Sequence, residues 1–528
     1  MERKKNGERG EGSFSWPEWL TPQVRLAFFS ALLFGMLSHG TGLWNKLSSH
    51  DDIFALFWEG STISSGRWML HVLGWLEKQV FGDGHFSLPV VNGLTALLWI
   101  GTAAGLLVHL LGIRKRWCCA GLGCVMAAFP TVAGLFGYMF TVHYYMLGMG
   151  MMVISACLIC AGKHWGTKIA AVLLGGCSVG IYQAFVPMLL SILLLYDLMC
   201  LAEKEENAGA FLKRLPAQAA CVLGIMVLYF AMNSFFLRKF GLEMNTYMGV
   251  DQMGTVPFRE YLARTAAAYR EFFCPVQYTS ADMYPMRAHY TYLAMICLDL
   301  LLGLWQGIRL WRKNRAKALL FFLMLALFPL ANNFIYVMAG RVHGLMTFSQ
   351  VMQTALFVWL ADRAAFQDTL RGKKTETILR RIGSGIAAAL LGLTAVLYAR
   401  FDNQCYLKAT FQQQEAISFF TALTAQIKAV PGFRDDMPVA FLNGEKITDG
   451  TLYHMNELDF IHLDPYGGTL RDYLNSYAWG SFMERWCGFS PAYADPGDYQ
   501  GLPEVQEMPH YPDDGSIRKL GDVILVNF

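Results

Sequence analysis

The chain carries little charge for its length. Asp, Glu, Lys and Arg make up 16% of its 528 residues and hydrophobic residues 54%, whereas soluble proteins have about 25% charged residues. The deficit falls between residues 20 and 400, because residues 401–528 have an ordinary soluble composition. A water-soluble fold is therefore excluded for most of the chain. The formal net charge of only +3, without a basic stripe, also argues against nucleic acid as a partner.

Motifs for nucleotides, zinc and disulfides are missing as well. There is no Walker loop, and no Gly-rich Rossmann fingerprint follows a strand, so nothing indicates ATP or dinucleotide use. Most of the twelve cysteines lie in apolar segments or at their ends. The three expected outside, Cys274, Cys405 and Cys487, are scattered and odd in number, which predicts no disulfide framework.

Long apolar segments are what the sequence has instead. A membrane-spanning helix needs roughly 20 mostly apolar residues. The stretch 168–202 is open to two interpretations, two short spans broken near Tyr182–Pro187 or one long kinked span. We predict an α-helical polytopic membrane protein with about eleven transmembrane helices. These lie near 22–44, 87–112, 118–136, 141–161, 168–184, 185–202, 216–236, 289–308, 318–338, 344–361 and 382–400.

Basic residues predict the orientation of these spans. Short cytoplasmic loops are enriched in Lys and Arg, and with eleven spans every basic loop shares a side with the basic N-terminus. We therefore expect a multi-pass protein of the inner or plasma membrane, with its N-terminus in the cytoplasm and residues from 401 onward outside. The basic residues are Arg114, Lys115, Arg116, Arg309, Arg312, Lys313, Arg315, Lys317, Arg371, Lys373, Lys374, Arg380 and Arg381.

Two outward loops are too long to be simple turns, 45–86 and 237–288. Their amphipathic stretches Ile53–Trp58, Trp68–Val80 and Phe258–Phe273 predict helices at the membrane surface.

The chain is expected to divide into a transmembrane domain, 1–400, and an extracytoplasmic domain, 401–528. The second domain begins with a predicted helix, Gln404–Val430. Two β-like runs follow, Pro438–Leu442 and Asp522–Phe528, separated by loops rich in Gly, Pro and Asp. This pattern predicts a small α/β domain outside the membrane.

The first outer loop contains the best candidates for chemistry. Asp51 and Asp52 directly follow the first span, where two adjacent carboxylates are costly to desolvate. They are interpreted either as a solvated cap at a helix N-terminus or as a general base or cation ligand. Arg67 follows in the same loop. It is either a snorkelling side chain or a planar fork suited to phosphate oxygens.

Further polar residues gather at the outer ends of spans. Each of them alone is more easily explained as structural, but a shared outer cavity would hold imidazole, guanidinium and acid groups, enough for phosphate recognition and proton transfer. The candidates are His143, Tyr144, Tyr182, Gln183, Arg287, His289, Arg341 and His343.

The order of these motifs resembles the serotype-converting type II glucosyltransferases that modify O-antigen. The similar segments are Asp51-Asp52, Gly66-Arg67-Trp68, Gly180-Ile181-Tyr182-Gln183, Tyr247-Met248-Gly249-Val250, the start of a late span at Arg341, and Asp402–Gln414. The large tail and the cysteine-rich spans differ from what is expected of that family, so an acceptor other than O-antigen stays open.

The resemblance implies a membrane glycosyltransferase of the C-type fold. It implies a polyprenyl-phosphate sugar donor, typically undecaprenyl-phosphate glucose, and a glycan or envelope polymer as acceptor on the outer face. One of Asp51 and Asp52 would be the base of an inverting displacement, and Arg67 and Arg341 would hold the donor phosphate. No cofactor is expected. A divalent cation beside the two acids is an alternative not favoured here, because Arg alone can neutralise a monophosphate.

A second function class fits the same spans. A lipid-linked sugar flippase or polysaccharide transporter would explain the outer polar residues without a base. It would not explain the carboxylates of the first loop or the large outer domain.

Overall fold

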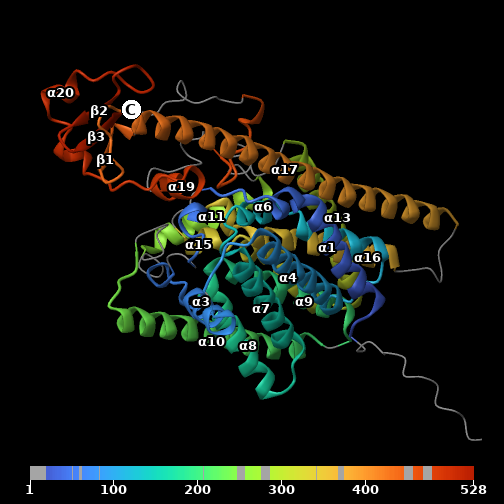
Figure 1. The fold of residues 1–528 in the computed structure, drawn as a ribbon. Helices are drawn as coiled ribbons and strands as arrows, with labels where there is room; N and C mark the ends of the chain where they lie inside the picture. Colours follow the sequence, from blue (N-terminus) through green and yellow to red (C-terminus); the bar gives the residue numbers. More distant parts are fainter. Residues whose placement is uncertain are drawn as a thin grey trace, which may run out of the picture.

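The computed structural model describes most of the chain (Figure 1). The residues described are 19–49, 51–58, 62–82, 84–205, 207–245, 256–274, 286–339, 342–366, 374–444, 456–467 and 478–528, except for the side chains at 286–287, 366, 374–380 and 456.

Helices dominate the first four hundred residues. Up to the end of α9 they are α1 (Pro22–Trp44), α2 (Asp51–Phe54), η1 (Ile63–Ser65), α3 (Trp68–Phe81), α4 (Pro89–Leu110), α5 (Arg116–Ala127), α6 (Pro130–Phe136), α7 (Val142–Ala161), α8 (Trp165–Ile181), η2 (Gln183–Phe185) and α9 (Val186–Glu203). They continue with α10 (Ala208–Phe240), α11 (Phe258–Phe273), α13 (Met286–Lys313), α14 (Arg315–Asn332), α15 (Ile335–Met338), η4 (Gly344–Met346), η5 (Phe348–Gln350), α16 (Val351–Phe366) and α17 (Lys374–Lys428).

Nine helical segments within the described ranges are long and apolar enough to cross a membrane. They correspond to nine of the eleven predicted spans. The other two predicted spans are the shorter apolar helix α8 and the 16-residue α16. The predicted helical, polytopic membrane architecture is confirmed. The nine segments are Pro22–Trp44, Pro89–Leu110, Arg116–Phe136, Val142–Ala161, Gln183–Glu203, Ala208–Phe240, Ala288–Lys313, Arg315–Asn332 and Arg381–Lys428.

The uncertain stretch 168–202 is two helices. Helix α8 ends at Ile181, and Tyr182 is extended, with φ −156° and ψ 116°. A new helix then starts at Val186, with Pro187 in its first turn. Proline is tolerated there because its missing N–H has no partner at a helix start. The break leaves Tyr182 extended and places Gln183 at the start of the short 3₁₀ helix η2.

The amphipathic stretches of the long loops are helical, as predicted. Residues Trp68–Phe81 form α3, and Phe258–Phe273 form α11 with the predicted bounds. The stretch Ile53–Trp58 is helical only at its start, in α2, and continues as a turn. The part of the second loop at 246–255 and 275–285, including Tyr247-Met248-Gly249-Val250, lies outside the described residues.

The last span continues without a break into the C-terminal region. The sequence predicted a span near 382–400 and a separate helix at Gln404–Val430, but both belong to the 55-residue helix α17. No proline interrupts it. It packs against α1, α5 and α19 (Trp479–Cys487). Figure 1 shows α17 as the orange helix that joins the bundle to the C-terminal strands.

The C-terminal region contains a three-stranded mixed sheet, with strands in the order β1-β3-β2. Strand β1 (Val439–Leu442) runs parallel to β3 (Val523–Asn527), and β2 (Ile517–Leu520) runs antiparallel to β3. Both predicted strands, β1 and β3, are confirmed. Strand β2 was not predicted because its Arg518 and Lys519 interrupt the apolar pattern. Short helices η7 (Asn456–Leu458), η9 (Pro496–Asp498) and α20 (Pro503–Gln506) complete this region.

The C-terminal region contacts the bundle through α6 and the turn that follows it. The Tyr466 hydroxyl donates to the Ala133 carbonyl oxygen at 3.0 Å. The Tyr138 hydroxyl lies 3.1 Å from both carboxylate oxygens of Asp464. Gly137 allows this close approach, because a Cβ there would lie 2.3 Å from Pro465.

All twelve cysteines are free. The prediction of no disulfide framework is therefore confirmed.

Candidate functional site

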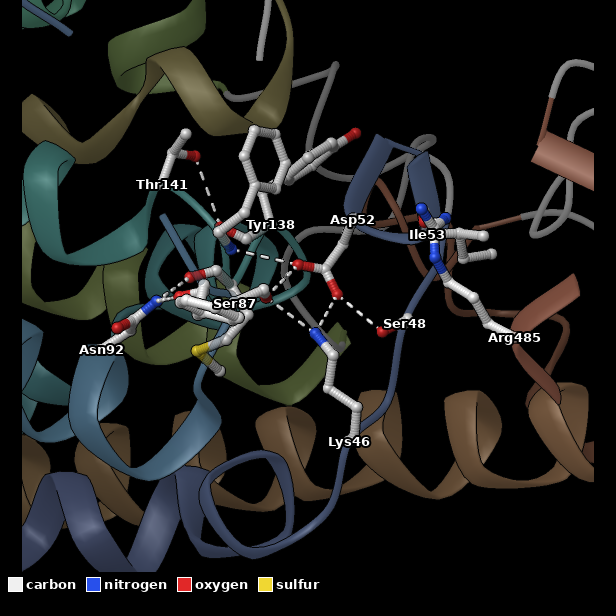
Figure 2. Close-up of polar contacts among 12 residues, drawn as sticks. Lys46, Ser48, Asp52, Ile53, Ser87, Asn92, Tyr138, Thr141 and Arg485 are labelled. Carbon is white, nitrogen blue, oxygen red and sulfur yellow. Dashed lines mark hydrogen bonds and ion pairs between the residues drawn. The ribbon is translucent and has the colours of Figure 1, made fainter. Parts of the chain in front are cut away.

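Asp52 is fully buried and accepts four hydrogen bonds (Figure 2). Its Oδ2 lies 2.5 Å from the Lys46 ammonium and 2.7 Å from the Ser48 hydroxyl. Its Oδ1 lies 2.6 Å from the Ser87 hydroxyl and 3.0 Å from the backbone N–H of Phe140. Each oxygen therefore has two donors.

These contacts stabilise the ionised carboxylate and occupy its lone pairs. A carboxylate has about four acceptor sites, and here one ammonium, two hydroxyls and one amide N–H fill them. All of these acceptor positions of Asp52 are therefore occupied by donors from the protein itself.

Asp51 lies beside it in the first turn of α2 but is exposed. Adjacent helical residues point about 100° apart, so the two side chains have different surroundings. The sequence left open which of the two acids is the base. Of the pair, the exposed Asp51 is the one that a solvent-borne hydroxyl can reach.

The donors to Asp52 come from chain segments that meet only in the folded protein. Lys46 and Ser48 follow α1, Ser87 precedes α4, and Phe140 lies in the turn between α6 and α7. The Asn92 side-chain amide joins the last two segments by donating to the carbonyl oxygens of Phe86 at 3.2 Å and Met139 at 3.1 Å. Figure 2 shows these side chains converging on Asp52.

The C-terminal region reaches the same loop through Arg485 of α19. Its guanidinium donates to the Ile53 carbonyl oxygen at 2.9 Å and lies 5.3 Å from the ring centroid of Phe57. The residue after Asp52 is therefore held by a side chain more than four hundred residues away in sequence (Figure 2).

Arg67 lies against two tyrosines at the break between α8 and α9. It donates to the Tyr145 hydroxyl at 3.1 Å, and its guanidinium carbon lies 5.2 Å from the ring centroid of Tyr182. The preceding Gly66 has φ 72°, and a Cβ there would lie 2.6 Å from the Gln183 side-chain nitrogen. Glycine is thus required for Arg67 to approach the break.

Gln183 connects the segment before Arg67 to α10. Its side-chain nitrogen donates to the Ser65 carbonyl oxygen at 2.9 Å and to the Tyr229 hydroxyl at 3.0 Å. The predicted candidates Arg67, Tyr182 and Gln183 are therefore brought together.

A second group of side chains gathers at the start of α7. Nδ1 of His85 lies 3.0 Å from Oε2 of Glu77, and the Tyr144 hydroxyl donates to the same oxygen. The rings of His85 and His143 are nearly parallel, with centroids 6.0 Å apart. Helix α7 thus contributes Tyr144 to this group and Tyr145 to the contact with Arg67.

Two further predicted candidates, His289 and His343, lie on elements outside these groups. His289 lies in α13 beside Tyr290; α13 packs on α14, α16 and α17, whereas α7 packs on α4 and α8. His343 precedes η4, which packs on α6. Arg341 and the side chain of Arg287 lie outside the described residues.

Sequence reasoning missed five polar residues of these groups, Lys46, Ser48, Glu77, His85 and Ser87. Each lies alone in an ordinary loop or amphipathic helix. The available signal was their position in the outer loop that carries Asp52 or, for Ser87, directly after it.

Comparison with known proteins identifies the chain's family. No curated protein is matched. The crystal structure of ArnT from Cupriavidus metallidurans bound to undecaprenyl phosphate is similar over 92% of this chain and 90% of that chain, at 13% identity and a TM-score of 0.36, too low to support a conclusion. The family described as glucosyl transferase GtrII matches residues 40–359, more than half of the chain. The chain therefore belongs to the GtrII family of glucosyltransferases and is an enzyme.

Proposed function

We propose that this enzyme moves a hexose, glucose as the family description indicates, from a polyprenyl-phosphate donor to a cell-envelope glycan or polymer on the outer face of the membrane. The observation that carries the proposal is the family match over residues 40–359. That range includes Asp51, Asp52 and Arg67, the polar groups described above.

The orientation in this proposal has the N-terminus in the cytoplasm and the C-terminal region outside. This orientation is supported by the basic residues that gather at one end of the bundle. Asp362 accepts from the backbone N–H groups of Arg114 at 3.0 Å and Lys115 at 2.7 Å, and Arg363 donates to the Leu111 carbonyl oxygen at 2.9 Å. Helix α4 separates this end from Ser87 and Asp52, so the positive-inside rule favours Asp52 and the C-terminal region on the outer side.

In the proposed reaction an acceptor hydroxyl attacks the anomeric carbon of the donor sugar. The new C–O bond forms as the bond from that carbon to the phosphate oxygen breaks, with inversion. Asp51 takes the hydroxyl proton, and the electron pair leaves with the polyprenyl phosphate. A carboxylate base in this role contributes about 10²–10⁴-fold to the rate.

Arg67 and Arg341 are proposed to hold the donor phosphate. For Arg67 the support is the packing of its guanidinium against Tyr145 and Tyr182, which limits the conformations open to the fork. A guanidinium fixed in this way can bind two phosphate oxygens and stabilise the charge that develops on the leaving group.

A lipid-linked donor needs an apolar site for its tail. A cavity of about 570 Å³ lies between α9, α10 and α14. Its walls are formed mainly by aliphatic side chains such as Leu194, Leu223 and Leu327. This surface suits an isoprenoid chain, and we propose it as the lateral entrance for the tail.

The C-terminal region is proposed to shape the acceptor site. Its contact through Arg485 with the carbonyl of Ile53 supports this role, because α19 then borders the loop that carries Asp51.

The proposal is tested with the purified full-length protein in vesicles, supplied with polyprenyl-phosphate glucose and an envelope glycan. The expected result is glucose transfer by the parental protein and a loss of about 10²–10⁴-fold in Asp51→Asn, with folding and donor binding retained. Asp514→Asn, an exposed acid of the C-terminal region, is the matched control and should retain full activity.

Two outcomes would contradict the proposal. Full transfer by the Asp51→Asn variant would show that Asp51 is not the base. Movement of the lipid-linked sugar across the bilayer by the parental protein, without any glucosylated product, would establish the flippase instead.

A further inference from the structure

Three side chains from separate elements form a compact set of metal-ligating groups. Glu77 lies in α3, His85 in the segment before α4, and His143 in the first turn of α7. One donor atom from each lies within 4.8 Å of the other two. Such a convergence of two imidazoles and a carboxylate is independent of the acid and arginine groups proposed for transfer.

Two of the imidazole nitrogens are buried without a hydrogen-bond partner among the described atoms. They are Nε2 of His85 and Nδ1 of His143. A buried polar atom without a partner destabilises the fold. A bound cation would relieve this for His143 by accepting the lone pair of its Nδ1, while Nδ1 of His85 is the nitrogen that faces Glu77.

We propose that Glu77, His85 and His143 bind one divalent transition-metal ion of the zinc type. Two nitrogens and one carboxylate oxygen suit such an ion, whereas Mg²⁺ and Ca²⁺ prefer oxygen ligands. Two ligand atoms of a tetrahedral ion, each about 2.1 Å from the metal, lie about 3.4 Å apart. Donor atoms within 4.8 Å of each other therefore have to approach by at most about 1.4 Å to share an ion.

The ion would connect α3 to the two segments that hold Asp52. His85 lies two residues before Ser87, and His143 three residues after Phe140, and Ser87 and Phe140 both donate to Asp52. The metal site thus has a positioning role for the first outer loop, and three protein ligands leave one tetrahedral position open.

The test measures metal directly, so that it does not depend on transfer activity. Full-length protein carrying an affinity tag without histidine is stripped with a chelator, dialysed, and titrated with Zn²⁺. Bound metal is counted by mass spectrometry after gel filtration. We expect about one Zn²⁺ per chain, and at least about tenfold weaker binding in Glu77→Gln, His85→Ala and His143→Ala. His164→Ala, which removes an exposed imidazole before α8, is the matched control and should bind as the parent does.

Titration of the parental protein with Co²⁺ covers the case in which a variant fails to fold. An intense visible absorption is expected from Co²⁺ in a four-coordinate site containing nitrogen ligands, and Zn²⁺ should displace it. Binding of less than 0.1 equivalent by folded parental protein, or equal binding by the parent and folded His85→Ala, would overturn the proposal.

Discussion

The Lys46 ammonium lies 2.5 Å from Asp52 Oδ2 and 2.7 Å from the Ser87 hydroxyl. One cation thereby joins the segment after α1 to the segment before α4. The carboxylate is fully buried, whereas the lysine side chain is 30% exposed. The pair is therefore a partly buried contact on which the geometry of the first loop depends.

Breaking this pair should destabilise the protein. Removal of one partner of a buried ion pair costs about 3–5 kcal/mol, and the exposure of Lys46 reduces this to about 2–3 kcal/mol. We expect both Asp52→Asn and Lys46→Met to lower the free energy of unfolding, measured by denaturant titration in detergent. The double variant should lose less than the sum of the two, because the interaction is absent after the first change. Strict additivity would show that the pair does not contribute.

Arg67→Lys should impair use of the donor. An ammonium cannot reproduce the two-pronged geometry of a guanidinium, and loss of a charge-assisted hydrogen bond costs about 1.5–3 kcal/mol. We expect kcat/KM for polyprenyl-phosphate glucose to fall by roughly ten- to a hundredfold, and the same for Arg341→Lys. Arg518→Lys, on the exposed side of β2, is the control. Parental kinetics in both variants would mean that neither arginine binds phosphate.

Thiol labelling tests the orientation. Single cysteines introduced near Lys373 and near Gly450 should react with a membrane-impermeant reagent from opposite sides of the membrane. The natural Cys274 is exposed and should be replaced by serine in the background. Labelling of both introduced sites from the outside in intact cells would refute the eleven-span topology.

Alkaline pH should destabilise the C-terminal region through Tyr511. Burial raises the pKa of this phenol above its ordinary value of 10.0. The folded state then holds its proton at a pH where the unfolded state has lost it, so stability is fully present below pH 10 and falls as pH rises beyond. Melting temperatures measured from pH 9 to 11 should decline less in Tyr511→Phe than in the parent or in the control Tyr499→Phe. An equal decline of the melting temperature with pH in Tyr511→Phe and in the parent would show that Tyr511 does not cause the alkaline loss of stability.

The distribution of apolar residues along the chain made the fold largely predictable. Runs of about twenty apolar residues indicate spans directly, because a helix of that length crosses the hydrocarbon core and satisfies its backbone hydrogen bonds within the segment. Strands β1 and β3 could also be predicted from the sequence, since each is a short apolar run between polar loops. The continuity of α17 was not predictable from the change in polarity near Phe401, because a helix can leave the membrane without changing its backbone.

The site was only partly predictable. Asp51, Asp52 and Arg67 stand out because charge is rare beside a span. The different surroundings of the two acids depend on Ser87 and Phe140, residues of common types that are distant in sequence. Glu77 and His85 were missed for the same reason, since their spacing resembles no metal motif and their meeting with His143 requires the packed bundle.

Helix α17 is one continuous helix that connects the bundle to the C-terminal region. At 1.5 Å per residue its 55 residues measure about 80 Å, against a hydrocarbon core of about 30 Å. Because the helix is unbroken and packs on both the bundle and α19, it sets the rotation of α19 relative to the bundle. One residue inserted after Gln414 would turn everything beyond it by about 100° and pull Arg485 away from Ile53.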